Sequence, residues 1–167
     1  MVKYNSKEFL KYQYLLNDDK EVALSILGKN SFSGKIFDLL SDRLKNDIDI
    51  AMKTVEYEPY NNYSSIFNEL YKDNKEVALH AIEYESLSSY HQYVLSHLSD
   101  RLRNDDDIVN KSISHNPLSF EYAGDKFKND INLCIKVLKM APSLINSMNE
   151  SFLEDYNFCE NFIKTLK

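Results

Sequence analysis

The sequence predicts an all-α protein whose short helix-pair repeats stack as a small right-handed α-solenoid-like array. Two observations predict this fold class: a pattern of polar and apolar residues recurs six times, and a second apolar pattern recurs between the copies. A period of a few tens of residues is typical of stacked supersecondary units. The first pattern is anchored on an apolar residue every 25 to 31 positions: Val22, Ile50, Val77, Ile108, Leu133 and Phe158.

Each anchor residue lies in the first turn of a predicted helix, which we call an anchor helix. Three positions earlier stands a residue whose side-chain oxygen can accept a hydrogen bond from a free amide of that turn. The anchor and the residues one and five positions after it are mostly small or apolar and share one helical stripe, so we expect this stripe to be buried. The third position after the anchor points away, which predicts that His80 is exposed. The predicted N-caps are Asp19, Asp47, Asn74, Asp105, Asp130 and Asp155.

A second amphipathic helix is predicted between successive anchor helices. Its start is marked by a proline or serine nine positions after the anchor, and both are common at helix starts. Apolar residues then recur at positions that share one helix face, and a cation usually follows in the last turn. The longest of these segments, residues 86–104, predicts an extra helical turn. Residues 41–47 and 99–105 differ at one position, which indicates duplication of a two-repeat block.

A single domain is predicted over residues 1–167, because 3 Gly and 3 Pro leave little material for linkers. The N-terminus carries charges where a secretion signal has an apolar run, and no segment is long and apolar enough to span a membrane. We therefore expect a cytoplasmic protein that does not bind membranes. The predicted repeat units are residues 5–18, 19–46, 47–73, 74–104, 105–129, 130–154 and 155–167.

The composition and the motifs argue against several functional classes. A net charge of −6 disfavours nucleic-acid binding, which needs clustered cations. His91 and His97 lack the spacing of a zinc-binding helix pair, and the sequence has no nucleophile turn or phosphate loop. Cys134 and Cys159 occupy a column of small residues and are expected to be buried thiols. We therefore predict a non-catalytic protein without cofactor or metal. An enzyme with an unrecognised site stays open as the alternative, and a deep pocket lined by the two histidines favours it.

The best-formed repeat resembles a known family. Residues 105–129 carry an Asp-Asp-Asp-Ile-Val start followed by Pro-Leu-Ser-Phe-Glu-Tyr-Ala at residues 117–123, and the pattern recurs with insertions along most of the chain. This alternation resembles the helical repeats catalogued as domain of unknown function 4116. The long segment of residues 86–104 and the last unit depart from the family pattern. The resemblance implies the repeat fold and brings no activity, cofactor or catalytic residue.

An acidic and aromatic surface is predicted where the anchor helices end. Residues 56–58 and 83–85 both read Glu-Tyr-Glu. Tyrosine gives a large contact area, and carboxylates attract a basic partner. This predicts an interaction module, with an immunity-type or other stoichiometric inhibitor as one form, in a chain that is a monomer or a weak homo-oligomer. A solvated acidic turn is the other interpretation. The candidate residues are Glu56, Tyr57, Glu58, Tyr60, Glu83, Tyr84, Glu85, Tyr90 and His115.

Overall fold

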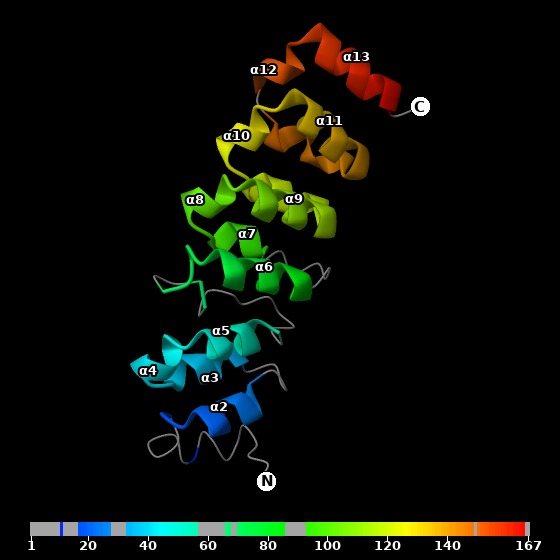
Figure 1. Ribbon diagram of the computed structural model, residues 1–167. Helices are drawn as coiled ribbons and strands as arrows, with labels where there is room; N and C mark the ends of the chain where they lie inside the picture. Colours follow the sequence, from blue (N-terminus) through cyan, green and yellow to red (C-terminus); the bar gives the residue numbers. More distant parts are fainter. Residues whose placement is uncertain are drawn as a thin grey trace. The chain divides into compact units, whose positions relative to one another are not determined.

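The computed structural model is all-α, which confirms the predicted class of a helical repeat array, and no strand occurs in the residues it describes (Figure 1). The chain divides into two compact units, Met1–Leu98 and Ser99–Lys167, which we call unit 1 and unit 2. The single domain stays a prediction, as does the right-handed solenoid. The described residues are 11, 17–27, 33–56, 66–67, 70–85, 93–148 and 150–165.

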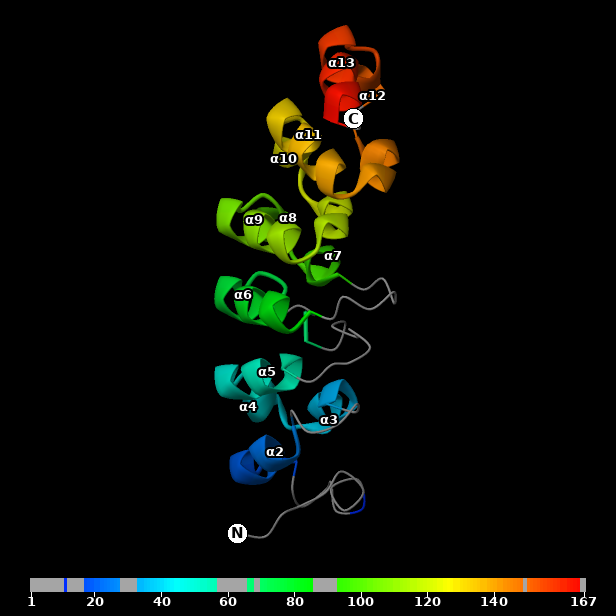
Figure 2. The ribbon, with the colours of Figure 1, turned by 90° about the vertical axis from the view of Figure 1, so that its right-hand side faces the viewer.

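Unit 1 pairs anchor helices with shorter segments. The anchor helix α5 packs against its neighbours α2, α3, α4 and α6, and α6 packs against α7. Figure 2 shows α3 and α7 on the opposite side of this unit from α2, α5 and α6. Its described helices are α2 (Lys20–Ile26), α3 (Ser33–Leu39), α4 (Asp42–Lys45), α5 (Ile48–Val55), α6 (Lys75–Tyr84) and α7 (Val94–His97).

Unit 2 repeats this arrangement, and the first part of two of its second segments is a 3-10 helix. The anchor helix α9 packs on η2, and α11 packs on η2, η3 and α13. Its described helices are α8 (Asp100–Arg103), α9 (Asp106–His115), η2 (Pro117–Tyr122), α10 (Asp125–Lys128), α11 (Ile131–Met140), η3 (Pro142–Ser147), α12 (Glu150–Leu153) and α13 (Tyr156–Thr165).

The anchor helices begin where the sequence predicts. All six predicted N-cap side chains accept hydrogen bonds of 3.0–3.2 Å from amides of the following turn. Five of the six anchor residues are buried, and Leu133 is half-buried. The stripe is least covered in α13, where Ile163 is 55% exposed although its equivalents in the other repeats are buried. The predicted core is therefore confirmed, with an exception at α13.

The predicted continuous second helix is wrong, because the structure breaks this segment in two. Leu98, Ala123 and Met148 end the first parts with extended backbone, at ψ of 160°, 150° and 159°. At the first two of these breaks the next residue is extended as well and starts a short second helix: Ser99 for α8 and Gly124 for α10. Two consecutive extended residues cannot continue an α-helix. The apolar spacing survives because both parts face the same core.

In two described repeats a backbone hydrogen bond joins the break to the residues just before the anchor helix. The amide of Ser41, which begins the second part in unit 1, donates a 2.8 Å hydrogen bond to the carbonyl of Asn17, just before α2. The amide of Gly124 makes the equivalent 2.8 Å bond to the carbonyl of Arg103, just before α9. In both repeats the bond connects the start of the second part to the residues just before the anchor helix.

The predicted extra turn in residues 86–104 falls on the part of that segment that the structure does not describe, and the described part is broken in two as in the other described repeats. Tyr93 is extended at φ −80° and ψ 136°, α7 ends at His97, and the break at Leu98 follows. Residues 86–92 lie outside the described residues, as does most of the predicted N-terminal helix, residues 5–17.

Candidate functional site

Four of the nine predicted partner-binding residues lie outside the described part of the chain: Tyr57, Glu58, Tyr60 and Tyr90. Glu56 is the C-cap of α5, and Glu83, Tyr84 and Glu85 lie at the end of α6, so the structure places these residues in unit 1. His115 is half-buried at the end of α9 in unit 2.

Glu56 connects the two anchor helices of the predicted surface. Its carboxylate accepts a hydrogen bond from Lys53 one turn earlier and lies 3.6 Å from Nε2 of His80 on α6. The side chain is 25% exposed. Much of the negative charge that the sequence predicts for this surface is therefore balanced within the surface itself.

Tyr84 is the exposed aromatic residue among the described members of this surface. It is 47% exposed, and its ring lies 5.1 Å from the ring of His80 at an interplanar angle of 50°. Glu83 beside it is exposed. The prediction that His80 is exposed is wrong in degree, since this side chain is 26% exposed between Tyr84 and Glu56. A tyrosine supported in this way loses little conformational freedom when it contacts a partner.

Glu85 does not belong to the surface, and its predicted contact with a partner is wrong. The residue is 4% exposed, because the chain leaves α6 there with its side chain directed inward. The nearest polar group that acts on the carboxyl group is the backbone amide of Val94 at the start of α7, and the N-cap residue Tyr93 gives no side-chain cap. Burial raises the pKa of Glu85 to about 7, although the amide of Val94 acts in the opposite direction. Glu85 is thus a buried acid at the end of α6.

Sequence analysis missed a residue of the same column. Tyr84 and His115 lie seven positions after their anchors, and the next repeat places Met140 there, at the end of α11. Met140 is 47% exposed. The same spacing, counted from Leu133, identifies Met140 in the sequence, but Met140 is neither acidic nor a tyrosine and so did not fit the predicted surface.

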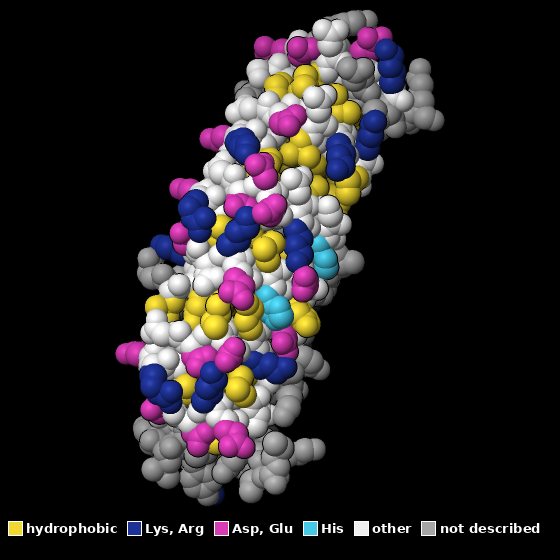
Figure 3. Space-filling model, viewed as in Figure 1, with side chains coloured by type: hydrophobic (Ala, Val, Ile, Leu, Met, Phe, Trp, Pro, Cys, Tyr) yellow, Lys and Arg dark blue, Asp and Glu magenta, His cyan; other side chains and the backbone are white. Residues whose placement is uncertain are grey.

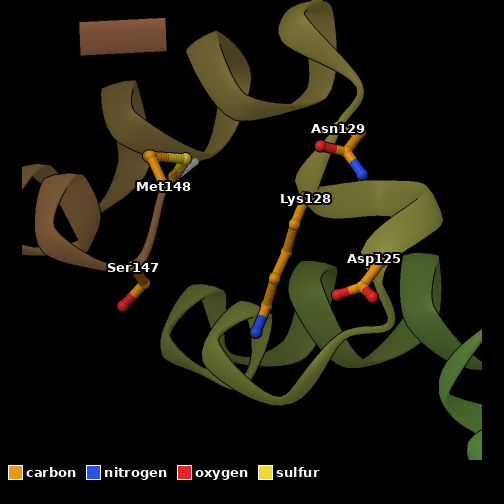
Figure 4. Close-up of a pocket in the computed structure, with 5 residues that line it drawn as sticks. All are labelled: Asp125, Lys128, Asn129, Ser147 and Met148. Carbon is orange, nitrogen blue, oxygen red and sulfur yellow. The ribbon is translucent and has the colours of Figure 1, made fainter. Parts of the chain in front are cut away.

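A cleft of about 370 Å³ lies in unit 2, and none of the residues that line it is a predicted site residue (Figure 4). In the close-up, the Lys128 side chain runs between the Ser147 and Met148 side and the Asp125 side. His97 does not line it, so this cleft gives no support to the alternative of a histidine-lined active site, and His91 lies outside the described residues. Nothing in the sequence pattern singled it out. The lining residues are Asp125, Lys128, Asn129, Ser147 and Met148.

Three further features bear on the predicted chemistry. Cys134 is fully buried, with its thiol 3.5 Å from the carbonyl oxygen of Lys128, and burial raises its pKa to about 11. Cys159 is half-buried, and both cysteines are free thiols. Within the described ranges no three His, Cys, Asp or Glu side chains are grouped to hold a metal ion. No helix in those ranges has the length and apolar character to cross a membrane.

These features define a class: an all-α repeat protein in which each repeat joins a capped anchor helix to a broken second segment. The chain belongs to the family described as Domain of unknown function (DUF4116), whose sequence model matches residues 19–71, 74–128 and 107–153. Comparison with curated proteins and with solved structures found no match.

Proposed function

We propose that the chain is a non-catalytic interaction module that binds a basic protein partner through the end of α6 in unit 1. The observation that carries this proposal is Tyr84, an aromatic side chain that is nearly half exposed, supported by His80 and flanked by the exposed Glu83. Aromatic residues held in place next to charges are typical centres of protein interfaces.

The physical argument rests on preorganisation. Tyr84 packs on His80, and His80 in turn faces Glu56 of the neighbouring helix. A partner therefore meets a side chain whose position is already restricted, so less entropy is lost on binding. Tyrosine also offers a hydroxyl group beside its apolar ring, which suits an interface that is partly wet.

The charge of the chain supports the basic nature of the partner. A net charge of −6 accelerates encounter with a basic protein and repels acidic ones at long range. Glu83 supplies a local carboxylate at the proposed contact. A small acidic protein of this kind suits a stoichiometric inhibitor or immunity-type role, in which one copy covers the basic functional surface of its target.

The test is affinity capture from the native host with the wild-type chain and the variants Glu83→Lys and Tyr84→Ala. Glu76→Lys is the matched control, because Glu76 is an exposed carboxylate on the same helix about 12 Å along the axis from Tyr84. We expect a basic protein that the wild type and the control capture and that both test variants lose by at least about tenfold. Circular dichroism checks that the variants remain folded.

The captured protein is then purified and titrated with the wild-type chain. A loss of the partner's own activity that is complete at one equivalent supports the inhibitor role. Capture that survives both Glu83→Lys and Tyr84→Ala removes this surface from the proposal. Capture of an acidic partner that both Glu83→Lys and Tyr84→Ala lose contradicts the charge argument.

A further inference from the structure

Unit 2 exposes lysines at the positions where unit 1 pairs opposite charges. Lys53 and Glu56 lie three and six residues after the anchor Ile50 and form an ion pair. The same two positions in α11, counted from Leu133, are Lys136 and Lys139. Both lysines are exposed, and neither makes an ion pair with any described residue. Where α5 has a Lys and a Glu that neutralise each other, α11 thus has two lysines without an ion-pair partner among the described residues.

Local helix energetics do not account for both lysines. Lys139 lies in the last turn of α11, where a cation favours the exposed carbonyls. Lys136 lies one turn earlier, so the two ammonium groups are neighbours on the helix surface and repel each other by a few tenths of a kcal/mol. A bound carboxylate would remove that repulsion.

An exposed apolar side chain adjoins the two cations. Met140 is 47% exposed directly after Lys139. Figure 3 shows Lys and Arg side chains next to apolar ones at the level of α11. On α9, Lys111 occupies the position equivalent to Lys136. Methionine adapts its shape to different apolar contacts and is frequent on surfaces that bind peptides.

We infer that Lys136, Lys139 and Met140 form a docking surface for an acidic protein segment with an apolar residue among its carboxylates. We call these three residues the lysine surface. It is separate from the proposed Tyr84 contact and has the opposite charge preference. The two cations receive the carboxylates, and Met140 receives the apolar side chain.

A protein segment fits this surface better than a phosphate polymer. Nucleic-acid binding needs cations spread along a face, because affinity comes from many phosphate contacts. Here two lysines adjoin an apolar residue, and the start of α11 carries the carboxylate of Asp130. The chain as a whole is negative, and this repulsion grows with the charge of the ligand, so it opposes a long polyanion more than a short acidic segment that contacts the two lysines directly.

The test uses a fluorescein-labelled peptide in which glutamates flank a central leucine, with the glutamine version as the probe control. Fluorescence anisotropy gives the dissociation constant for the full chain at ionic strengths of about 0.05 M and about 0.15 M. Lys139→Glu is the decisive variant, because it recreates on α11 the charge pattern that Lys53 and Glu56 have in unit 1. The helix gains an ion pair, so the variant is expected to fold as the wild type does. Lys45→Glu, in the last turn of α4, is the control with the same change of charge.

We expect the glutamate peptide to bind the wild type and Lys45→Glu with dissociation constants that agree within about twofold. It should bind Lys139→Glu at least about tenfold more weakly. Met140→Ser should weaken binding about threefold to tenfold, since it removes apolar contact area. The glutamine peptide should not bind measurably.

Several results overturn the inference. The first is absence of binding by the wild type. The second is equal weakening by Lys45→Glu and Lys139→Glu. The third is no effect of Lys139→Glu or of Met140→Ser. If oligothymidine or polyphosphate binds as tightly as the peptide, the ligand of this surface is a phosphate polymer and not an acidic protein segment. If the free chain self-associates and Lys139→Glu abolishes this association, the surface binds a second copy of the chain instead.

Discussion

The repeat that starts unit 1 and the repeat of residues 105–129 in unit 2 close through the same backbone bond but support it with different side chains. In unit 1 the hydroxyl of Ser41 hydrogen-bonds to the carboxylate of Asp18. In unit 2 the equivalent residue is Gly124, and a Cβ atom there would overlap the side-chain amide of Asn104. A hydrogen bond in one repeat is thus replaced by a close steric fit in the other. The backbone geometry is the constant part of this fold.

The two units also differ in the charges at the ends of their anchor helices. Lys53, Glu56 and His80 form one connected cluster in unit 1. The corresponding positions of α11 hold Lys136 and Lys139, which lack such compensation among the described residues. The positions three, six and seven residues after the anchor vary in chemistry while the anchor stripe stays apolar. Both proposed contacts, at Tyr84 and at the lysine surface, use these variable positions.

The largest expected effect compares two isoleucines of one column within unit 2. Ile113 is 3% exposed and Ile163 is 55% exposed, and both lie five residues after their anchor. Ile113→Ala should lower the free energy of unfolding by about 3 kcal/mol, because it removes a buried side chain and leaves a cavity. Ile163→Ala should change it by less than about 0.5 kcal/mol. Urea denaturation followed by circular dichroism measures both, and similar losses contradict the exposure of Ile163.

The same variant tests the predicted single domain. If the two units unfold together, Ile113→Ala should reduce amide-exchange protection in both of them. Loss of protection confined to residues 99–167 means that the units unfold independently, and the chain then has two domains.

The next effect in size is a pH dependence that distinguishes two equivalent positions of the repeats, Glu85 and Asn116. Glu85 and Asn116 both lie eight residues after their anchor, and Asn116 caps η2 by accepting a 3.1 Å hydrogen bond from the amide of Leu118. Only Glu85 can titrate. Its pKa is raised from 4.5 to about 7 in the folded chain, so between these values the folded chain retains a proton that the unfolded chain has released.

The stability that Glu85 contributes is therefore greatest below pH 4.5 and is lost as the pH rises through about 7, by on the order of 2 to 3 kcal/mol. Glu85→Gln should remove this loss, so the variant should be the more stable protein at about pH 8 and similar to the wild type near pH 4.5. The lowered pKa values of Asp18 and Asp47 act below their ordinary value of 3.8, outside this window. Urea titrations across the range measure the slope, and parallel slopes for the two proteins contradict the assignment.

A smaller effect is expected from the caps that begin the anchor helices. Asp105 accepts hydrogen bonds from the amides of Asp107 and Ile108 at 3.0 and 3.2 Å. Asp105→Ala should lower the free energy of unfolding by about 1 kcal/mol, whereas Asp105→Asn keeps the accepting oxygen and most of that stability. Equal losses in both variants would show that the charge of Asp105, rather than its cap, stabilises α9.

The sequence predicted the anchor helices well because their signals are local. A capping oxygen at a fixed spacing before an apolar stripe is enough to place the start of a helix, and Asp19 and Asp155 behave alike at opposite ends of the chain. The second segments were predicted less well, because a helical apolar spacing also fits two short helices that face one core. Ser41 and Ser99 were the signals of the break, since both accept a 3.3 Å hydrogen bond from the amide three residues later.

The candidate surface shows a similar division. Tyr84 and Glu83 lie at the surface as their place in the column predicts. Glu85 does not, because it is buried where α6 ends, and the spacing of the repeats alone does not show which way its side chain turns. Lys136 and Lys139 could not be predicted from the sequence as a binding surface. The proposal depends on their having no ion-pair partner among the described residues, and that requires the arrangement in space.

The smallest expected effect tests the steric fit that opened the comparison of the two repeats. Gly124 has φ −68° and ψ 164°, which any residue adopts, so Gly124→Ala meets no backbone strain. The added methyl group instead displaces the side chain of Asn104, which loses its 2.9 Å hydrogen bond to the carbonyl of Asp100. Because Asn104 is exposed and free to rotate, the cost should be about 0.5 kcal/mol. In Asn104→Ala the same glycine substitution should cost nothing further, and a double-mutant cycle by urea denaturation measures this coupling. Additive losses would place the origin of the effect in the backbone, and would mean that Gly124 and Ser41 are not equivalent positions of the two repeats.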